Sequence, residues 1–216
     1  PSMALLKSHF EISETQEAAL SSSERPIVIV KTLSPERCGI SSAIAPSLNQ
    51  LGIMLPNSGI LQLVANEIDF PIVATSGNRS GYPVQSNTSD AFEMLNPIAD
   101  YFLQHNLKIT HPQDDSVLKF SKKFASPVLF RRSRGYAPNY PNFRISNTST
   151  VMAMGAQLKS TIAFLPNDYL YVSQYIGHLD NYGVYKRFVE TASDFRTIFQ
   201  EEPRIILVDK HPAYHS

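Results

Sequence analysis

The chain has 216 residues and carries 19 lysines and arginines against 19 aspartates and glutamates, so its formal net charge is zero. A neutral chain creates no bulk field that favours nucleic acid or an anionic membrane, and no apolar run approaches the roughly 20 residues of a membrane span. The single cysteine, Cys38, excludes an internal disulfide and a cysteine-based zinc cluster, and we expect it to be structural. Because the amino terminus also has no signal-peptide pattern, these features predict a soluble cytoplasmic protein.

The first half of the chain alternates between strand and helix patterns. Ser13 and Gln16 form a capping box that begins a short helix. Apolar runs bounded by polar or turn residues predict strands, of which 27–31 is apolar enough to be central and 70–73 is expected to be buried. The expected strands of this half are 1–6, 27–31, 51–56, 70–73 and 99–103, and the expected helices are 58–68 and 89–95, with a loop at 34–46.

The second half begins with a predicted antiparallel pair of strands and then changes its pattern. A stretch rich in Pro, Asn, Ser and Thr at 138–150 predicts a linker. Beyond it the helical pattern 181–202 presents one apolar face and meets Pro203, which is expected to end it. The expected strands of this half are 115–120, 127–131, 151–154, 161–165, 169–172 and a buried 205–209. This order predicts a mixed α/β sheet followed by a β-β-β-α-β unit, which resembles the opening of an actin/sugar-kinase nucleotide fold.

A polar loop at 74–83 follows the expected strand at 70–73. Two glycines there let the backbone pass close to a ligand. Ser76 and Asn78 are short donors and acceptors at the carboxyl end of a strand, where open α/β sheets place ligand crevices. A tight polar turn explains the same composition. The loop is not a Walker P-loop, because no Gly-Lys-Ser/Thr follows.

Two further clusters of charged residues are candidates for chemistry. Asp114 and Asp115 at a strand start could hold a metal or orient a base, or could form a solvated turn. Three arginines within four positions, 131–134, can grip phosphate or carboxylate oxygens. They could equally mark an exposed basic edge strand that discourages pairing.

Taken together, these motifs resemble the hydrogenase maturation carbamoyltransferase (HypF) family. Thr-Ser-Gly-Asn-x-Ser-Gly at 75–81, Asp-Asp-Ser-Val at 114–117 and Arg-Arg-Ser-Arg-Gly-Tyr-Ala-Pro at 131–138 are similar to its YrdC-like domain. Gly-Ala-Gln-Leu-Lys-Ser-Thr at 155–161, Ser-Gln-Tyr-Ile-Gly-His-Leu at 173–179 and Asp-Lys-His-Pro at 209–212 are similar to its carbamoyl-transfer domain. The resemblance is colinear and covers essentially the whole chain. It implies a partial YrdC-like domain at 1–145 and the first lobe of an actin/sugar-kinase-like (ASKHA) transfer domain at 146–216.

The resemblance also implies an activity in two steps. ATP, as its magnesium complex, and carbamoyl phosphate give carbamoyl-adenylate, and the carbamoyl group then passes to the C-terminal cysteine of a HypE-like partner. Nucleotide binding is implied for Thr75, Ser76, Asn78, Ser116 and Gly155, and a catalytic role for Arg132, Arg134 and Lys159. His211, which follows a strand-terminal aspartate, is the candidate metal ligand.

The chain departs from the family pattern at four polar positions. Leu107 and Pro112 stand where the family tends to have Arg, Tyr175 stands for a His, and His178 stands for an Asp. Elements of the family that precede the YrdC-like motifs, and its paired-histidine metal site, have no counterpart in the sequence. We therefore expect a piece or a redirected relative of the family. The alternatives are a nucleotide- or RNA-binding module without chemistry, and a degenerate remnant that only binds a partner.

Overall fold

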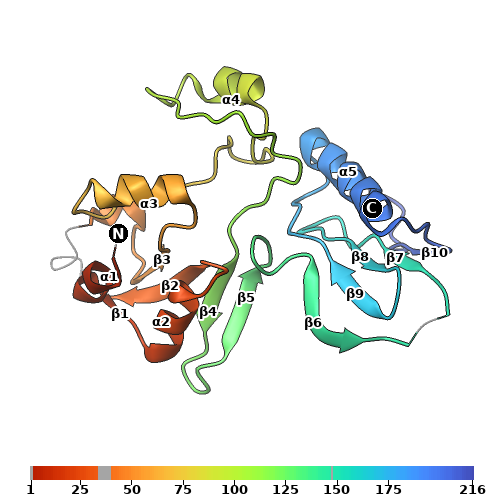
Figure 1. Cartoon of the computed structure of the whole chain (residues 1–216), viewed down its shortest axis with the longest axis horizontal. Helices are drawn as coiled ribbons and strands as arrows, with labels where there is room; N and C mark the ends of the chain where they lie inside the picture. Colours follow the sequence, from red (N-terminus) through yellow and green to blue (C-terminus); the bar gives the residue numbers. More distant parts are fainter. Residues whose placement is uncertain (1, 34–39, 147) are drawn as a thin grey trace. The chain divides into compact units, whose positions relative to one another are not determined.

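The computed structural model describes residues 2–33, 40–146 and 148–216, so Cys38 lies outside the described residues. The chain forms two compact units (Figure 1). Unit 1 comprises Pro1–Ala74 with Asp115–Gly135, and unit 2 comprises Thr75–Asp114 with Tyr136–Ser216. Each unit is described by itself. Within the described part of the chain no helix has the length and apolarity to cross a membrane.

The sheet of unit 1 is built around one central strand. Its strands are β1 (Phe10–Glu11), β2 (Ile27–Thr32), β3 (Gln50–Ile53), β4 (Val117–Phe120) and β5 (Pro127–Arg131). Strand β2 pairs antiparallel with β1 and β3 and parallel with β4, and β4 pairs antiparallel with β5. The central position of 27–31 and the antiparallel pair 115–120/127–131 are thereby confirmed. The completely buried side chains of Leu20 and Val28 lie in the core of this unit.

In its described residues, unit 1 has three α-helices, α1 (Met3–His9), α2 (Glu14–Ser21) and α3 (Gly59–Asn66), with a 3-10 turn η1 (Ser42–Ile44). The capping box of Ser13 and Gln16 is confirmed at the start of α2. The strand expected at 1–6 is wrong. Ser2 accepts a hydrogen bond from the backbone N–H of Leu5 and so caps α1, and Leu6 turns into the core.

Two other expected strands are absent from the described residues. The segment 70–73 was expected to be a buried strand, yet Phe70, Ile72 and Val73 are 57%, 51% and 67% exposed and pair with no described strand. The segment 99–103 is likewise irregular, with Tyr101 93% exposed. Apolar composition supplies a preference for extended backbone, but a strand forms only where a neighbouring strand offers its N–H and C=O groups.

Unit 2 carries the second sheet, whose spatial order is β10-β7-β8-β9-β6. Its strands are β6 (Asn139–Arg144), β7 (Val151–Ala153), β8 (Ala163–Leu165), β9 (Tyr169–Val172) and β10 (Ile205–Leu207). Strands β7, β8 and β9 form an antiparallel meander, and β10 returns parallel to β7. This confirms the expected β-β-β-α-β order. The linker expected at 138–150 is wrong in part, because β6 occupies it and pairs with β9.

Helix α5 (Tyr182–Phe199) packs against this sheet (Figure 1). Asn181 caps it by accepting hydrogen bonds from the N–H groups of Gly183 and Val184. The helix ends before Pro203, because Gln200 adopts a left-handed conformation with φ of 53°. The phenyl rings of Phe164 and Phe195 stack in the core with centroids 6.2 Å apart. Strand β10 was expected to be buried, but its residues are exposed.

Unit 2 also contains α4 (Thr88–Leu95), which confirms the helix expected at 89–95. Asn87 caps it by accepting the N–H of Ser89. Arg79, in the polar loop at 74–83, donates to the carbonyl of Met94 near the carboxyl end of α4. That bond ties the polar loop to a helix of the same unit.

Candidate functional site

The polar loop at 74–83 closes on itself through Asn78. The side-chain amide of Asn78 donates to the carbonyls of Arg79, at 3.1 Å, and Tyr82, at 2.8 Å. The backbone N–H of Gln85 donates to the carbonyl of Gly77 at 3.0 Å. Because an amide nitrogen has only two N–H donors, Asn78 has only its carbonyl oxygen left for a ligand. Asn78 therefore shapes the loop.

The two hydroxyl side chains of this loop are presented to solvent. Thr75 and Ser76 are both exposed, and neither hydroxyl has a hydrogen-bond partner in the described part of the chain. Each can donate one hydrogen bond and accept two. Such free donors next to a loop of fixed shape are suited to phosphate or carbonyl oxygens.

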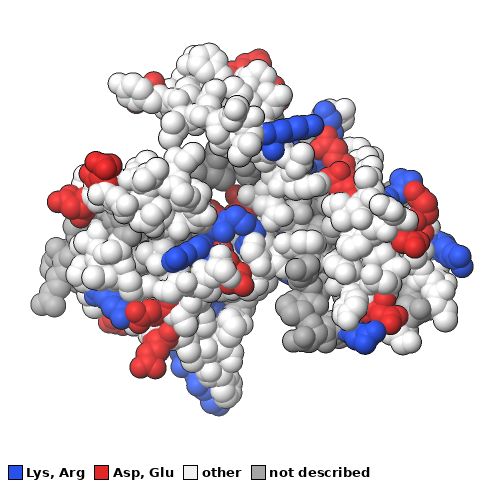
Figure 2. Space-filling view, in the orientation of Figure 1, with Lys and Arg blue, Asp and Glu red and all other residues white. Residues whose placement is uncertain are grey.

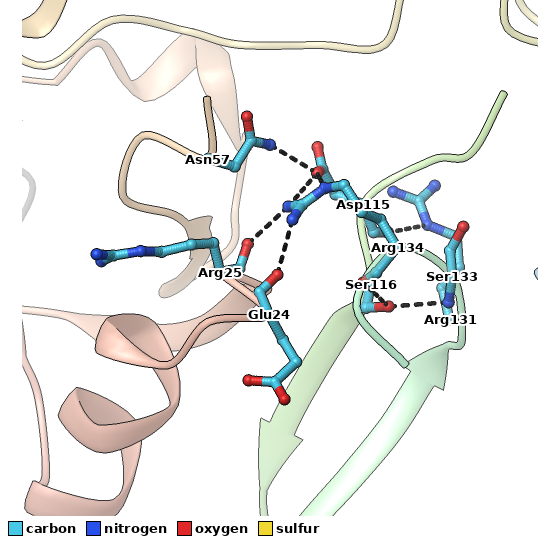
Figure 3. A network of polar contacts seen from close by, with 8 residues as sticks. All are labelled: Glu24, Arg25, Asn57, Asp115, Ser116, Arg131, Ser133 and Arg134. Atoms are coloured by element: carbon cyan, nitrogen blue, oxygen red, sulfur yellow. Dashed lines mark hydrogen bonds and ion pairs between the residues drawn. The ribbon is translucent and has the colours of Figure 1, made fainter. Parts of the chain in front are cut away.

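A second constellation lies in unit 1 and centres on Asp115 (Figure 3). Its Oδ1 accepts from the Nη2 of Arg134 at 2.7 Å, from the Nε of Arg134 at 3.0 Å and from the amide of Asn57 at 3.0 Å. Arg134 also donates from Nη1 to the carbonyl of Glu24 at 2.8 Å and from Nη2 to the carbonyl of Arg25 at 2.9 Å. Four of the five N–H donors of this guanidinium are thus used within the protein. The side chain joins three segments of unit 1.

Ser116 is enclosed in the same region and is fully buried. Its hydroxyl donates to the carbonyl of Arg134 at 2.9 Å and accepts the backbone N–H of Ser133 at 2.8 Å. Arg131 donates from Nε to the carbonyl of Asp115 at 2.8 Å. The sequence suggested Ser116 as a ligand donor and Arg134 as a catalytic charge. The Ser116 hydroxyl and four of the five Arg134 donors are engaged inside the fold, so in this geometry both residues position the segment 131–134.

The third constellation is the turn between β7 and β8 in unit 2. Gly155 has φ of 69°, and a Cβ at this position would collide with the carbonyl oxygen of Thr161. Lys159 also adopts a left-handed conformation, with φ of 53°, and its exposed side chain has no partner among the described residues. The hydroxyl of Ser160 is buried and has no hydrogen-bond partner. The turn therefore presents one free ammonium group on a backbone that only glycine permits.

Gln157 fixes this turn, and the sequence analysis assigned it no role. The side chain is 6% exposed, its amide donates to Asp180 at 2.8 Å, and its carbonyl accepts the N–H of His215 at 2.9 Å. A polar residue between Ala156 and Leu158 was the available signal. A single glutamine in a turn is too common to have indicated these two hydrogen bonds.

His211, the candidate metal ligand, lies beside Asp209 and Tyr214. Its backbone N–H donates to Asp209 at 2.8 Å, and its ring stacks on Tyr214 with centroids 4.2 Å apart. Among residues 2–33, 40–146 and 148–216, no group of three or more His, Cys, Asp or Glu side chains could hold a metal ion. Asp115, one of the two acidic candidates for a metal site, is already engaged by Arg134 and Asn57.

Most of the expected site residues thus fall into three groups. Thr75, Ser76 and Asn78 share the polar loop in unit 2, whereas Ser116 and Arg134 share the Asp115 network in unit 1. Gly155 and Lys159 share the β7–β8 turn. Arg132 is half-buried beside the Asp115 network. Of the positions that depart from the family pattern, Leu107 and His178 are exposed, and Pro112 and Tyr175 are half-buried.

Two protein-family models match the chain. The Sua5/YciO/YrdC model, described as telomere recombination, matches residues 1–133. The model described as the HypF Kae1-like domain matches residues 146–216.

Individual relatives give the same picture over nearly the whole chain. The chain is 32% identical over 208 residues to the carbamoyltransferase HypF of Synechocystis, covering 96% of this chain and 27% of the relative. It is 34% identical to a probable carbamoyltransferase HypF of Methanocaldococcus jannaschii, covering 95% of this chain and 26% of the relative. The chain therefore spans about a quarter of the length of these relatives.

Two solved structures are similar throughout the chain. A full-length HypF in a phosphate- and nucleotide-bound form superposes with a TM-score of 0.90 at 33% identity, covering 99% of this chain and 33% of that one. The HypF of T. kodakarensis superposes with a TM-score of 0.89, covering 99% of this chain and 27% of that one. These similarities support the mixed α/β fold class with a YrdC-like and a Kae1-like part.

Proposed function

Because the chain belongs to the Sua5/YciO/YrdC family and is also similar to HypF proteins over 95% or more of its length, we propose that it forms part of a HypF-type carbamoyltransferase. The observation that carries the proposal is the colinear match to two family models, 1–133 and 146–216. Those ranges also support a division into a YrdC-like nucleotide domain at 1–145 and the start of a carbamoyl-transfer domain at 146–216.

The proposed reaction has three steps, and in each of them one bond forms as another breaks. Carbamoyl phosphate loses inorganic phosphate to water, and the carbamate oxygen attacks the α-phosphorus of ATP as pyrophosphate leaves. The cysteine thiolate of a HypE-like partner then attacks the carbonyl carbon of the carbamoyl-adenylate, and AMP leaves. We place this chemistry in the cytoplasm.

Nucleotide binding is proposed for the loop at 74–83. The exposed hydroxyls of Thr75 and Ser76 would donate to phosphate oxygens, and the carbonyl oxygen of Asn78 would accept from an amino or hydroxyl group of the ligand. Magnesium would be bound by the phosphate groups of ATP, and Thr75 and Ser76 would contribute only neutral hydrogen-bond donors. The role of Asn78 is mainly to hold the loop closed.

The arginine cluster and the β7–β8 turn take different parts in the proposal. Arg132 would offset phosphate charge, while Arg134 and Ser116 act as positioning residues. Gly155 and Lys159 would bind a phosphate or adenylate oxygen at the transfer site, where the lysine supplies a point charge. His211 remains a candidate metal ligand, and a complete metal site would need further ligands.

A chimera tests this proposal, because the chain covers only part of its relatives. In the chimera, these 216 residues replace the matching segment of the Synechocystis carbamoyltransferase. We expect carbamoyl-phosphate-dependent release of pyrophosphate from ATP, and a loss of about a hundredfold or more in the Ser76→Ala/Asn78→Ala variant, because it removes a preorganised hydroxyl donor and the amide that holds the loop closed. Ser80→Ala, in the same exposed loop, is the matched control and should stay within about twofold of the parent. A folded chimera without turnover would contradict the activity, and an active double variant would contradict the site.

A further inference from the structure

A cavity of about 590 Å³ lies within unit 2, apart from the hydroxyls of the polar loop and from the β7–β8 turn. It is lined by residues 83–87 and Asp90, by residues 108–111, and by one face of α5 from Gly183 to Asp194. This volume is typical of small-molecule sites. The lining is rich in charged side chains, which points to a polar ligand.

The acidic side chains contributed by α5 already have basic neighbours. Arg187, which is 23% exposed, lies 3.3 Å from Glu190 and donates to the hydroxyl of Ser86 at 3.4 Å. His111 lies 3.1 Å from the carboxylate of Asp194. These pairs hold Glu190 and Asp194 and fix Arg187 at the wall of the cavity. Asp90 is the remaining acid of the lining.

Two lysines of the same lining have no such neighbour. Lys108 and Lys186 are exposed, and neither has a hydrogen bond or ion pair in the described part of the chain. The lining has as many acidic side chains as lysines and arginines, so the site depends on the placement of these two unpaired ammonium groups and not on a net positive charge. Figure 2 shows basic and acidic side chains interspersed over the face in view, so that face is not generally basic.

We propose that this cavity is an anion site that binds a ligand of the phosphate class between Lys108 and Lys186. The lysines supply mobile charges that adapt to the ligand, and Arg187 supplies a fixed one. The hydroxyl of Thr110, which also lines the cavity, adds a neutral donor. The site does not depend on the proposed carbamoyl transfer, because Thr75, Ser76, Asn78 and Lys159 are not among its lining residues.

Calorimetric titration of the 216-residue chain with pyrophosphate at two salt concentrations tests the site. We expect binding that weakens as salt rises, because the attraction between charges is screened. The Lys108→Gln/Lys186→Gln variant should lose roughly tenfold or more in affinity, because two charge-assisted contacts are removed. The control is Lys122→Gln/Lys123→Gln, which removes the same two charges from the β4–β5 hairpin of unit 1 and should change the affinity by less than about twofold. Titrations with inorganic phosphate and AMP identify which member of the class is preferred.

Several results would overturn the proposal. One is that pyrophosphate does not bind to wild-type protein whose circular dichroism shows a folded chain. Another is that the Lys108→Gln/Lys186→Gln and Lys122→Gln/Lys123→Gln variants lose affinity for pyrophosphate equally. A third is that the Lys108→Gln/Lys186→Gln variant binds pyrophosphate as tightly as the wild type. The Ser76→Ala variant, which removes an exposed hydroxyl and keeps the bonds that close the loop, separates this site from the nucleotide loop. If it abolishes pyrophosphate binding, the anion binds in the loop, and this proposal fails while the nucleotide proposal stands.

Discussion

Replacement of Gly155 by alanine is expected to destabilise unit 2 by about 3 kcal/mol or more, since left-handed strain and steric overlap each cost about 1–3 kcal/mol. The backbone at Gly155 has φ of 69°, and the new methyl group would meet the carbonyl oxygen of Thr161, which cannot rotate away as a side chain would. The β7–β8 turn would have to open. Hydrogen exchange of the amides of β7 and β8 would report the loss directly.

Gly81→Ala is the matched control for this prediction. Gly81 has φ of 81°, but an added Cβ would meet nothing within 4 Å. Only the conformational strain applies, so the expected loss is about 1–2 kcal/mol. Equal effects of the two substitutions would show that the contact with Thr161 is unimportant.

Arg134→Met is expected to destabilise unit 1 by about 2–3 kcal/mol, because truncating one partner of a partly buried ion pair strands the other. The substitution removes four hydrogen bonds and leaves the carboxylate of Asp115 with Asn57 as its remaining side-chain donor. The expected loss of stability is smaller than that for a fully buried ion pair, because the Arg134 and Asp115 side chains are 30% and 28% exposed. Hydrogen exchange of the β4 and β5 amides measures it.

Two variants sharpen this experiment. Arg134→Lys keeps the charge but lacks the planar guanidinium group, so the stability of its unit 1 should lie between those of the wild type and Arg134→Met. Arg144→Met removes a pair to Asp168 whose side chains are 65% and 49% exposed, and it should change stability by less than about 1 kcal/mol. An Arg134→Met protein as stable as the Arg144→Met protein would contradict the structural role of Arg134.

The local parts of the fold were predictable, because their causes lie within a few residues of sequence. The capping box at Ser13 depends on residues three apart, and α5 follows from one apolar face. The run 70–73 has the composition of a strand, yet pairing depends on chain that is distant in sequence. Strand β6 was missed for the converse reason: its Pro- and Asn-rich sequence looks like a linker, but β9 supplies a pairing edge.

The candidate site shows the same division. The shape of the polar loop follows from its own glycines and Asn78, so sequence alone could indicate it. The role of Arg134 depends on carbonyls of Glu24 and Arg25 that lie more than 100 residues earlier in the chain. A motif of arginines indicates only the capacity to bind an oxyanion. Whether that capacity serves a ligand or the fold is decided by which partners the tertiary structure brings near.

The proposed role of the loop that carries Ser76 is to bind the nucleotide. Calorimetric titration of the 216-residue chain with ATP, and then with ATP and carbamoyl phosphate together, tests it most directly. We expect micromolar binding of ATP to the wild-type chain. Binding should be at least about tenfold weaker in Ser76→Ala, which removes a free hydroxyl without touching the bonds that close the loop. Absence of heat from a demonstrably folded wild-type chain, or undiminished binding in Ser76→Ala, would contradict it.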